Sequence, residues 1–85
     1  MNIDDLLSAL GGQANIRKVD NALARIRVGV VDRSIVDKAA LEKAGALGVV
    51  VQKRAVQLIL GEEAESIGMA LYRRVFGANM AEVEG

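Results

Sequence analysis

The chain has 85 residues, the length of one small domain. Its 11 basic and 11 acidic side chains balance, and only 2% of its residues are aromatic, which argues against a general nucleic-acid or membrane-surface role. Without cysteine or histidine it can form neither disulfides nor thiolate metal sites, and it lacks the commonest general base. We therefore expect no metal, no cofactor and, since no apolar run is long enough to cross a bilayer, a cytoplasmic domain.

The first expected element is a helix over residues 3–10. Asn2 can cap the free amides at its start, and the acids Asp4 and Asp5 complement the helix dipole there. Gly11 can end the helix in a left-handed conformation.

A β-hairpin is expected next, with strands near 15–19 and 24–31. Apolar and polar residues alternate strictly along the second strand, and Asp20-Asn21 is a turn-type pair between the two. The alternation predicts that Ile26, Val28 and Val30 point inward and that Arg25 and Arg27 point outward.

Ser34 and Asp37 resemble a capping box for a second helix, which Gly45 would end. Two β-branched runs flanked by glycines, 48–51 and 56–60, predict two further strands.

The last expected helix begins among the acids near Glu62 and ends with Arg73 and Arg74 before Gly77. Both charge placements suit the helix dipole. We expect residues 1–77 to form the domain and 78–85 to be a disordered tail.

Short motifs between residues 11 and 61 align with one known family pattern without an insertion or a deletion. They are Gly11-Gly12, Asn15-Ile16, Asp20-Asn21-Ala22-Leu23-Ala24-Arg25-Ile26-Arg27-Val28, Val36-Asp37, Leu41, Gly45-Ala46, Gly48-Val49-Val50, Val56-Gln57 and Gly61. Together they resemble the IIB domains of the glucose and N-acetylglucosamine type in the bacterial sugar phosphotransferase system (PTS). The resemblance implies an α+β fold in which three helices pack on one face of a four-stranded antiparallel sheet.

In that family a cysteine takes phosphate from a phosphohistidine on a IIA protein and passes it to a sugar in the membrane permease IIC. Ala22 stands at the position of this cysteine, and a methyl group cannot attack phosphorus. The resemblance thus implies a catalytic position that is inactive in this chain. An acyl phosphate on Asp20 is a less favoured route.

Arg25 and Arg27 stand at the two arginine positions of the family, and Lys53-Arg54 replaces part of a glycine-rich turn that the family pattern places near the cysteine loop. Guanidinium groups suit phosphate. The candidates for binding phosphate or a partner are therefore Asp20, Arg25, Arg27, Lys53 and Arg54, which Arg17 and Lys18 would extend into a basic patch. The alternative is that these are ordinary solvated strand and turn residues.

Three functions are compatible with this pattern. The favoured one is a partner-binding or regulatory module that does not transfer phosphate. Its partner would be a IIA phosphocarrier, a IIC permease, which would hold it at the inner face of the membrane, or a transcriptional regulator. One alternative is an ordinary IIB domain whose cysteine was replaced by design, and the other is a phosphate- or anion-binding protein. None involves direct nucleic-acid binding or membrane insertion.

Overall fold

The computed structural model describes residues 1–77. Its helices and strands are, in chain order, α1 (Ile3–Ala9), β1 (Ile16–Ala22), β2 (Arg25–Val30), α2 (Lys38–Lys43), β3 (Gly48–Val51), β4 (Ala55–Ile59) and α3 (Ala64–Phe76). Short 3₁₀ turns precede β1, α2 and α3. The order of elements is the predicted one, and the tail predicted for 78–85 lies outside the described residues.

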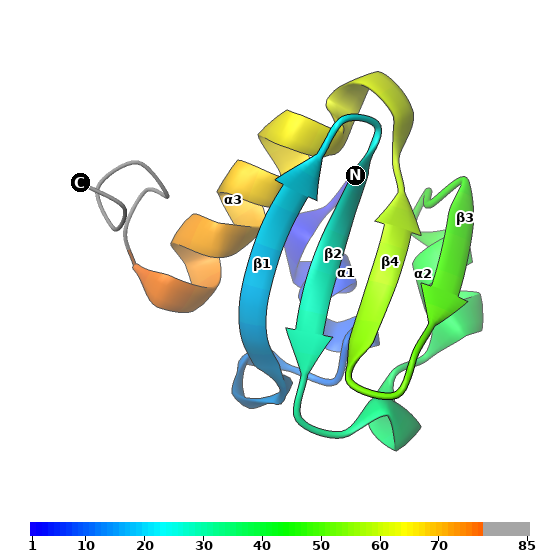
Figure 1. Cartoon of the computed structure of the whole chain (residues 1–85), viewed down its shortest axis with the longest axis vertical. Helices are drawn as coiled ribbons and strands as arrows, with labels where there is room; N and C mark the ends of the chain where they lie inside the picture. The colour runs from blue at the N-terminus through cyan, green and yellow to red at the C-terminus, as the bar shows by residue number, and fades with distance from the viewer. Residues whose placement is uncertain (78–85) are drawn as a thin grey trace.

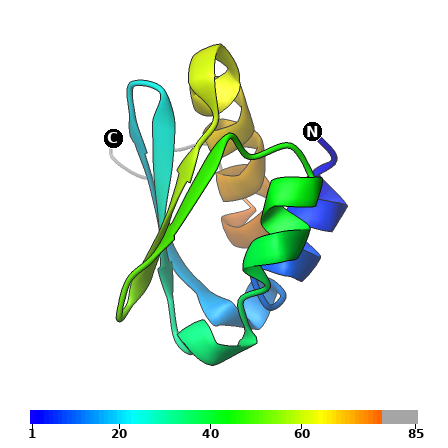
Figure 2. The same cartoon turned by 90° about the vertical axis from the view of Figure 1, so that its right-hand side faces the viewer.

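The four strands form one sheet with the order β1-β2-β4-β3, and every neighbouring pair is antiparallel (Figure 1). All three α-helices lie on the same side of this sheet (Figure 2). The α+β architecture implied by the resemblance is therefore confirmed. The opposite side of the sheet, which faces the viewer in Figure 1, carries no helix; it is called the open face below.

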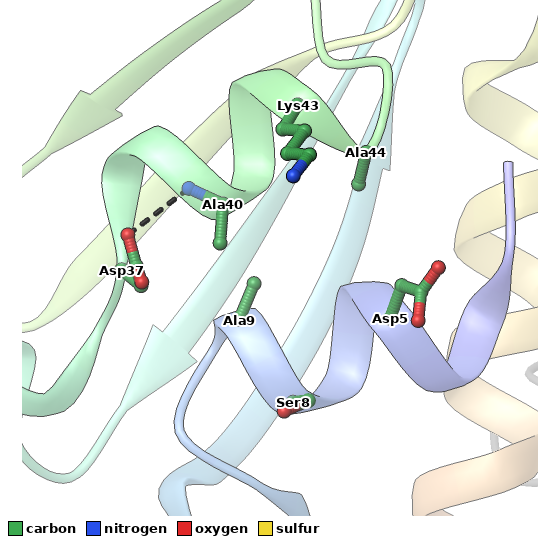
Figure 3. Close-up of a pocket in the computed structure, with 7 residues that line it drawn as sticks. All are labelled: Asp5, Ser8, Ala9, Asp37, Ala40, Lys43 and Ala44. Carbon is green, nitrogen blue, oxygen red and sulfur yellow. Dashed lines mark hydrogen bonds between the residues drawn. The ribbon is translucent and has the colours of Figure 1, made fainter.

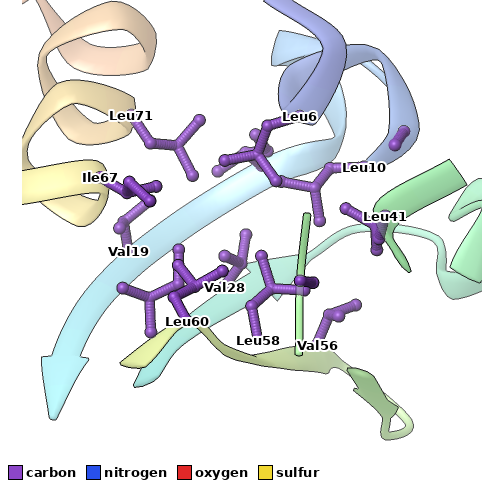
Figure 4. Packing of buried hydrophobic residues seen from close by; sticks show 14 of the residues in the cluster. Leu6, Leu10, Val19, Val28, Leu41, Val56, Leu58, Leu60, Ile67 and Leu71 are labelled. Atoms are coloured by element: carbon purple, nitrogen blue, oxygen red, sulfur yellow. The ribbon is translucent and has the colours of Figure 1, made fainter. Parts of the chain in front are cut away.

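The core fills the space between the sheet and the helices (Figure 4). The inward side chains predicted for β2 are buried, with exposed fractions of 0 to 2%. They pack with leucines of all three helices, among them Leu6, Leu41 and Leu71. Each such aliphatic side chain contributes roughly 1.5–3 kcal/mol through burial, which compensates for the scarcity of aromatic residues.

The hairpin turn predicted at Asp20-Asn21 is wrong. Both residues pair with β2 in the antiparallel ladder, and β1 continues to Ala22. The chain reverses at Leu23, whose φ of 51° lies in the left-handed region that non-glycine residues rarely adopt. Pairing along the ladder prevails over the turn preference of the Asp-Asn pair, and the turn falls on a residue that is not a typical turn former.

The predicted capping box at the start of α2 is also wrong. Ser34 lies in a 3₁₀ turn, where its backbone amide and its hydroxyl both donate hydrogen bonds to Asp32, at 2.9 and 2.6 Å. The backbone is extended at Val36, so the helix can begin only after Asp37. Asp37 is itself the cap, and its carboxylate accepts a hydrogen bond from the amide of Ala40 at 3.0 Å.

Buried Asn15, in the 3₁₀ turn before β1, is hydrogen-bonded to the end of α1 and to the segment after β2. Its side-chain amide donates to the carbonyl oxygens of Leu10 (2.7 Å) and Asp32 (3.0 Å), and its side-chain oxygen accepts from the amide of Asp32 (2.8 Å). These bonds connect the end of α1 to the chain that leaves β2.

Gly68 lets α3 lie directly against β1. A Cβ atom at this position would stand 1.8 Å from the side-chain oxygen of Asn21 and 2.9 Å from Ile26. Any larger residue would push the helix away from the end of the sheet at which the β1–β2 hairpin turns.

Candidate functional site

Ala22 is the last residue of β1, and it lies at the tip of the β1–β2 hairpin (Figure 1). Its methyl group is exposed and lines an open pocket of about 340 Å³ with Leu23, Ala24, Arg25 and Ile59. Ala22 is therefore accessible to another molecule.

Two hydrogen bonds hold the hairpin tip in place. The carbonyl oxygen of Ala24 accepts from the amides of Leu60 and Gly61, at 2.8 and 3.0 Å. These two residues connect β4 to the turn before α3. The hairpin tip is thus attached to the segment that follows β4, a central strand of the sheet.

The lining of this pocket contains one charged side chain, Arg25. Its guanidinium donates to the side-chain oxygen of Gln57 at 3.3 Å, and the amide of Gln57 donates in turn to Gln52 at 3.4 Å. A guanidinium is a donor group suited to anions, and none of the side chains that line this pocket is a nucleophile.

Asp20 and Arg27 lie opposite each other in the β1–β2 ladder on the open face, two residues from the Ala22/Arg25 pair at the hairpin tip. Both arginines of β2 are exposed, as the alternation predicted. The carboxylate of Asp20 lies 3.7 Å from the ammonium of Lys18 and is about half exposed. It therefore takes part in a surface ion pair, which is an ordinary environment for a carboxylate.

The structure contradicts the expectation that Lys53 and Arg54 lie near the Ala22 loop. Arg25 pairs with one end of β4, whereas Gly29 pairs with Ala55 at the other end, four residues away. At about 3.3 Å per residue this separation is roughly 13 Å. The turn before Ala55 is at the far end of the sheet from the hairpin tip (Figure 1).

The expected basic patch is consequently divided. Arg25 lies at the hairpin tip, whereas four other cations surround a separate pocket of about 310 Å³ at the far end. The residues that line this far pocket are Arg17, Lys18, Arg27, Gly29, Val30 and Arg54. Gly29 was not among the predicted site residues, although a glycine inside a strand is a known sign of a bulge or a close approach.

A third pocket, of about 460 Å³, lies between α1 and α2 (Figure 3). Its walls are mostly alanines and a serine, and its charged side chains are Asp5, Asp37 and Lys43. Asp37 is already engaged as the helix cap. The pocket is on the helical side of the sheet, away from Ala22, and within residues 1–77 no cluster of His, Cys, Asp and Glu could hold a metal ion.

Comparisons with known proteins identify the fold and the sequence pattern. The family described as "phosphotransferase system, EIIB" matches residues 4–37, which include the hairpin. The "PTS system N-acetylmuramic acid-specific EIIBC component" of Pasteurella multocida (strain Pm70) is 40% identical over 80 residues, 93% of this chain and 17% of that protein. The "PTS system N-acetylglucosamine-specific EIICB component" of Bacillus subtilis (strain 168) is 41% identical over 66 residues, 76% of this chain and 15% of that protein.

A solved structure agrees with these relatives. The crystal structure of one domain of the PTS system IIabc component from Clostridium difficile superposes with a TM-score of 0.72 at 27% identity, covering 85% of this chain and 76% of that one. The chain spans less than a fifth of the length of the two curated relatives. Among the described residues, no helix has the length and apolarity to cross a membrane. The chain belongs to the IIB domains of the glucose and N-acetylglucosamine type of the sugar phosphotransferase system.

Proposed function

We propose that this IIB domain does not carry phosphate and acts instead as a docking module for another protein. The observation that carries the proposal is the hairpin tip. There Ala22 presents a methyl group at the position where the family has its phosphorylated cysteine, next to a leucine that is 98% exposed. Phosphate transfer through this position needs an ionised thiol, which a methyl group cannot replace.

The surface around the tip is suited to a protein partner. Three large apolar side chains are exposed at or near this end of the sheet: Leu23, Leu47 and Ile59. The amide of Leu47 donates to the carbonyl of Ile59 at 2.8 Å, which holds the two side by side. Apolar residues grouped in this way, with Arg25 beside them, are typical of the centre of a protein interface.

Leu23 gives the strongest support. It has a left-handed backbone conformation, costing roughly 1–2 kcal/mol, and its side chain gains nothing from burial in the domain. Strain kept at an exposed apolar residue is easier to explain by a contact with another molecule than by folding.

The proposed partners are those of the phosphotransferase system and its regulation. The two curated relatives are described as EIIBC and EIICB components, so a permease of the IIC type is the first candidate. A IIA phosphocarrier or a transcriptional regulator would also meet an accessible tip. With any of them the domain would occupy a binding surface without accepting phosphate.

Incubation with phosphoenolpyruvate and the upstream phosphocarriers tests the missing transfer step. The wild-type chain should keep its mass, and Ala22→Cys should gain the mass of one phosphoryl group. Resistance of that group to hydroxylamine, which cleaves acyl phosphates, would assign it to the new thiol. A stable phosphoryl adduct on the wild-type chain would overturn the proposal.

Docking is tested separately with a IIA protein and a detergent-solubilised IIC permease from the same organism. Leu23→Asn should abolish retention of the domain on the immobilised partner, because asparagine tolerates the backbone conformation but removes the apolar contact. Val31→Asn is the matched control, since Val31 is 64% exposed and follows β2 at the other end of the sheet. Equal retention of wild type and Leu23→Asn would show that the tip is not the docking site.

A further inference from the structure

We propose that the far pocket of the open face binds the phosphate group of a small soluble anion, either inorganic phosphate or a phosphate monoester. This pocket is lined by Arg17, Lys18, Arg27 and Arg54 over Gly29 and Val30, and Gly29 lies roughly 13 Å along the sheet from Arg25, the partner of Ala22. The inference does not depend on the docking function, because it concerns a different end of the sheet.

A β-bulge places two consecutive cations on the same side of the sheet. Ile16 pairs with Val30 and Lys18 pairs with Gly29, so Arg17 is an extra residue in β1. Regular alternation would send one of two neighbouring side chains into the core. Here Arg17 and Lys18 are both exposed and both line the far pocket. Bulges commonly redirect side chains in this way next to functional sites.

Gly29 forms the floor of the pocket. Its flanking residues in β2 are core valines, while its own position points to the open face beside Lys18. A Cβ atom here would lie 3.2 Å from the Cβ of Lys18, closer than side chains normally pack. The absence of a side chain therefore leaves space between the surrounding cations, which a ligand atom can enter.

Arg27 and Arg54 complete the wall from two further segments. Arg27 lies two residues before Gly29 in β2, and Arg54 lies in the turn between β3 and β4. The carbonyl oxygen of Arg54 accepts a hydrogen bond from the amide of Val30 at 2.9 Å. The backbone that carries this arginine is thus attached to the strand that forms the floor of the pocket.

The charge of the pocket favours a phosphate dianion over a carboxylate. Four cations line it, and within residues 1–77 the acid that forms an ion pair with one of them is Asp20, 3.7 Å from Lys18. Three of the four are arginines, whose planar donor forks match the oxygens of phosphate. A single carboxylate would neutralise a smaller part of this charge. A concave pocket with convergent donors also suits a small ligand better than a flat macromolecular surface.

The test is a titration of ¹⁵N-labelled protein with inorganic phosphate, and in parallel with glycerol 3-phosphate, against sodium chloride at matched ionic strength. Saturable amide shifts should centre on residues 17, 18, 29 and 54, with little change at residues 22–25. The double variant Arg17→Gln/Arg54→Gln should weaken the affinity by about tenfold, because it removes charge-assisted hydrogen bonds. Lys38→Gln/Lys43→Gln, with the same change of charge on the helical side, should bind like wild type.

Gly29→Ala tests the geometry without removing a charge, and it should also weaken binding because its methyl group occupies the floor. The proposal is overturned if chloride gives the same shifts, if the arginine double variant binds like wild type, or if the shifts centre on the hairpin tip. Vesicles of phosphatidylglycerol test whether the phosphate group belongs to a lipid. If the protein binds these vesicles but responds to neither inorganic phosphate nor glycerol 3-phosphate, the proposed soluble ligand is overturned.

Discussion

Replacing Asn15 by alanine should destabilise the domain strongly. Only 3% of the surface of Asn15 is exposed, and its side chain makes three hydrogen bonds to backbone groups of Leu10 and Asp32. The substitution leaves two carbonyl oxygens and one amide without these partners. At about 1 kcal/mol for each bond, the free energy of unfolding should fall by roughly 3 kcal/mol. A domain of this size has a total stability of only about 5–15 kcal/mol.

Urea unfolding followed by circular dichroism measures this loss. The urea concentration at the midpoint of unfolding should fall. The slope of the unfolding free energy against urea concentration should stay unchanged, because the surface exposed on unfolding is nearly the same. Thermal unfolding should shift downward by roughly 12–24 °C, from about 4–8 °C for each kcal/mol in a domain of this length.

Asn2→Ala is the matched control. The side chain of Asn2 makes one exposed hydrogen bond, to the amide of Asp5 at 3.1 Å, as the cap of α1. Its loss should cost about 1 kcal/mol or less. If Asn15→Ala costs no more than Asn2→Ala, then water replaces the three bonds and the reasoning about the buried side chain is refuted.

Three further predictions follow from single positions. Leu23→Gly should raise the free energy of unfolding by up to about 1 kcal/mol in urea titrations, since it relieves the left-handed strain; a loss of stability would mean that the leucine contributes to folding. Gly68→Ala should lower the melting temperature, at a cost of about 1–3 kcal/mol from overpacking against Asn21, and an unchanged melting temperature would contradict the close contact of α3 with β1. Hydrogen bonds from the hydroxyl of Ser34 and, with a smaller effect, from its amide hold the pKa of the Asp32 carboxyl below its ordinary value of 3.8. The contribution of this carboxylate to folding stability is therefore present above pH 3.8 and is lost as the pH falls through the lower pKa of the folded state. Asp32→Asn should therefore flatten the acid limb of stability against pH, and parallel acid limbs in wild type and variant would refute the assignment.

The order and character of the elements could be predicted because these properties depend on neighbours in the sequence. Strict alternation from residue 24 to 30 identified the buried and exposed sides of β2, and the cap at Asn2 marked the start of α1. The boundaries were less predictable. The turn residues Asp20 and Asn21 lie inside β1, because the ladder with β2 stabilises them in an extended conformation there.

The candidate site could be predicted only in part. The alternation along the second strand predicted that both arginines of β2 point outward, and they are exposed as expected. It did not indicate Leu23, since apolar residues are usually buried and the exposure of this one is known only once the strands are placed. The expectation that Lys53 and Arg54 lie near the Ala22 loop was wrong because the order of residues in the chain does not say which end of a sheet a turn occupies.

The sequence by itself determined that the chain contains no histidine or cysteine and that helices and strand pairs alternate. Tertiary structure alone decided which cations share a pocket. The pairing of β2 with β4 puts Gly29 opposite Ala55, and the bulge in β1 turns Arg17 and Lys18 to the same side. Such register depends on pairing between strands rather than on neighbours within one strand, and a shift by one residue would send each of these side chains to the opposite face.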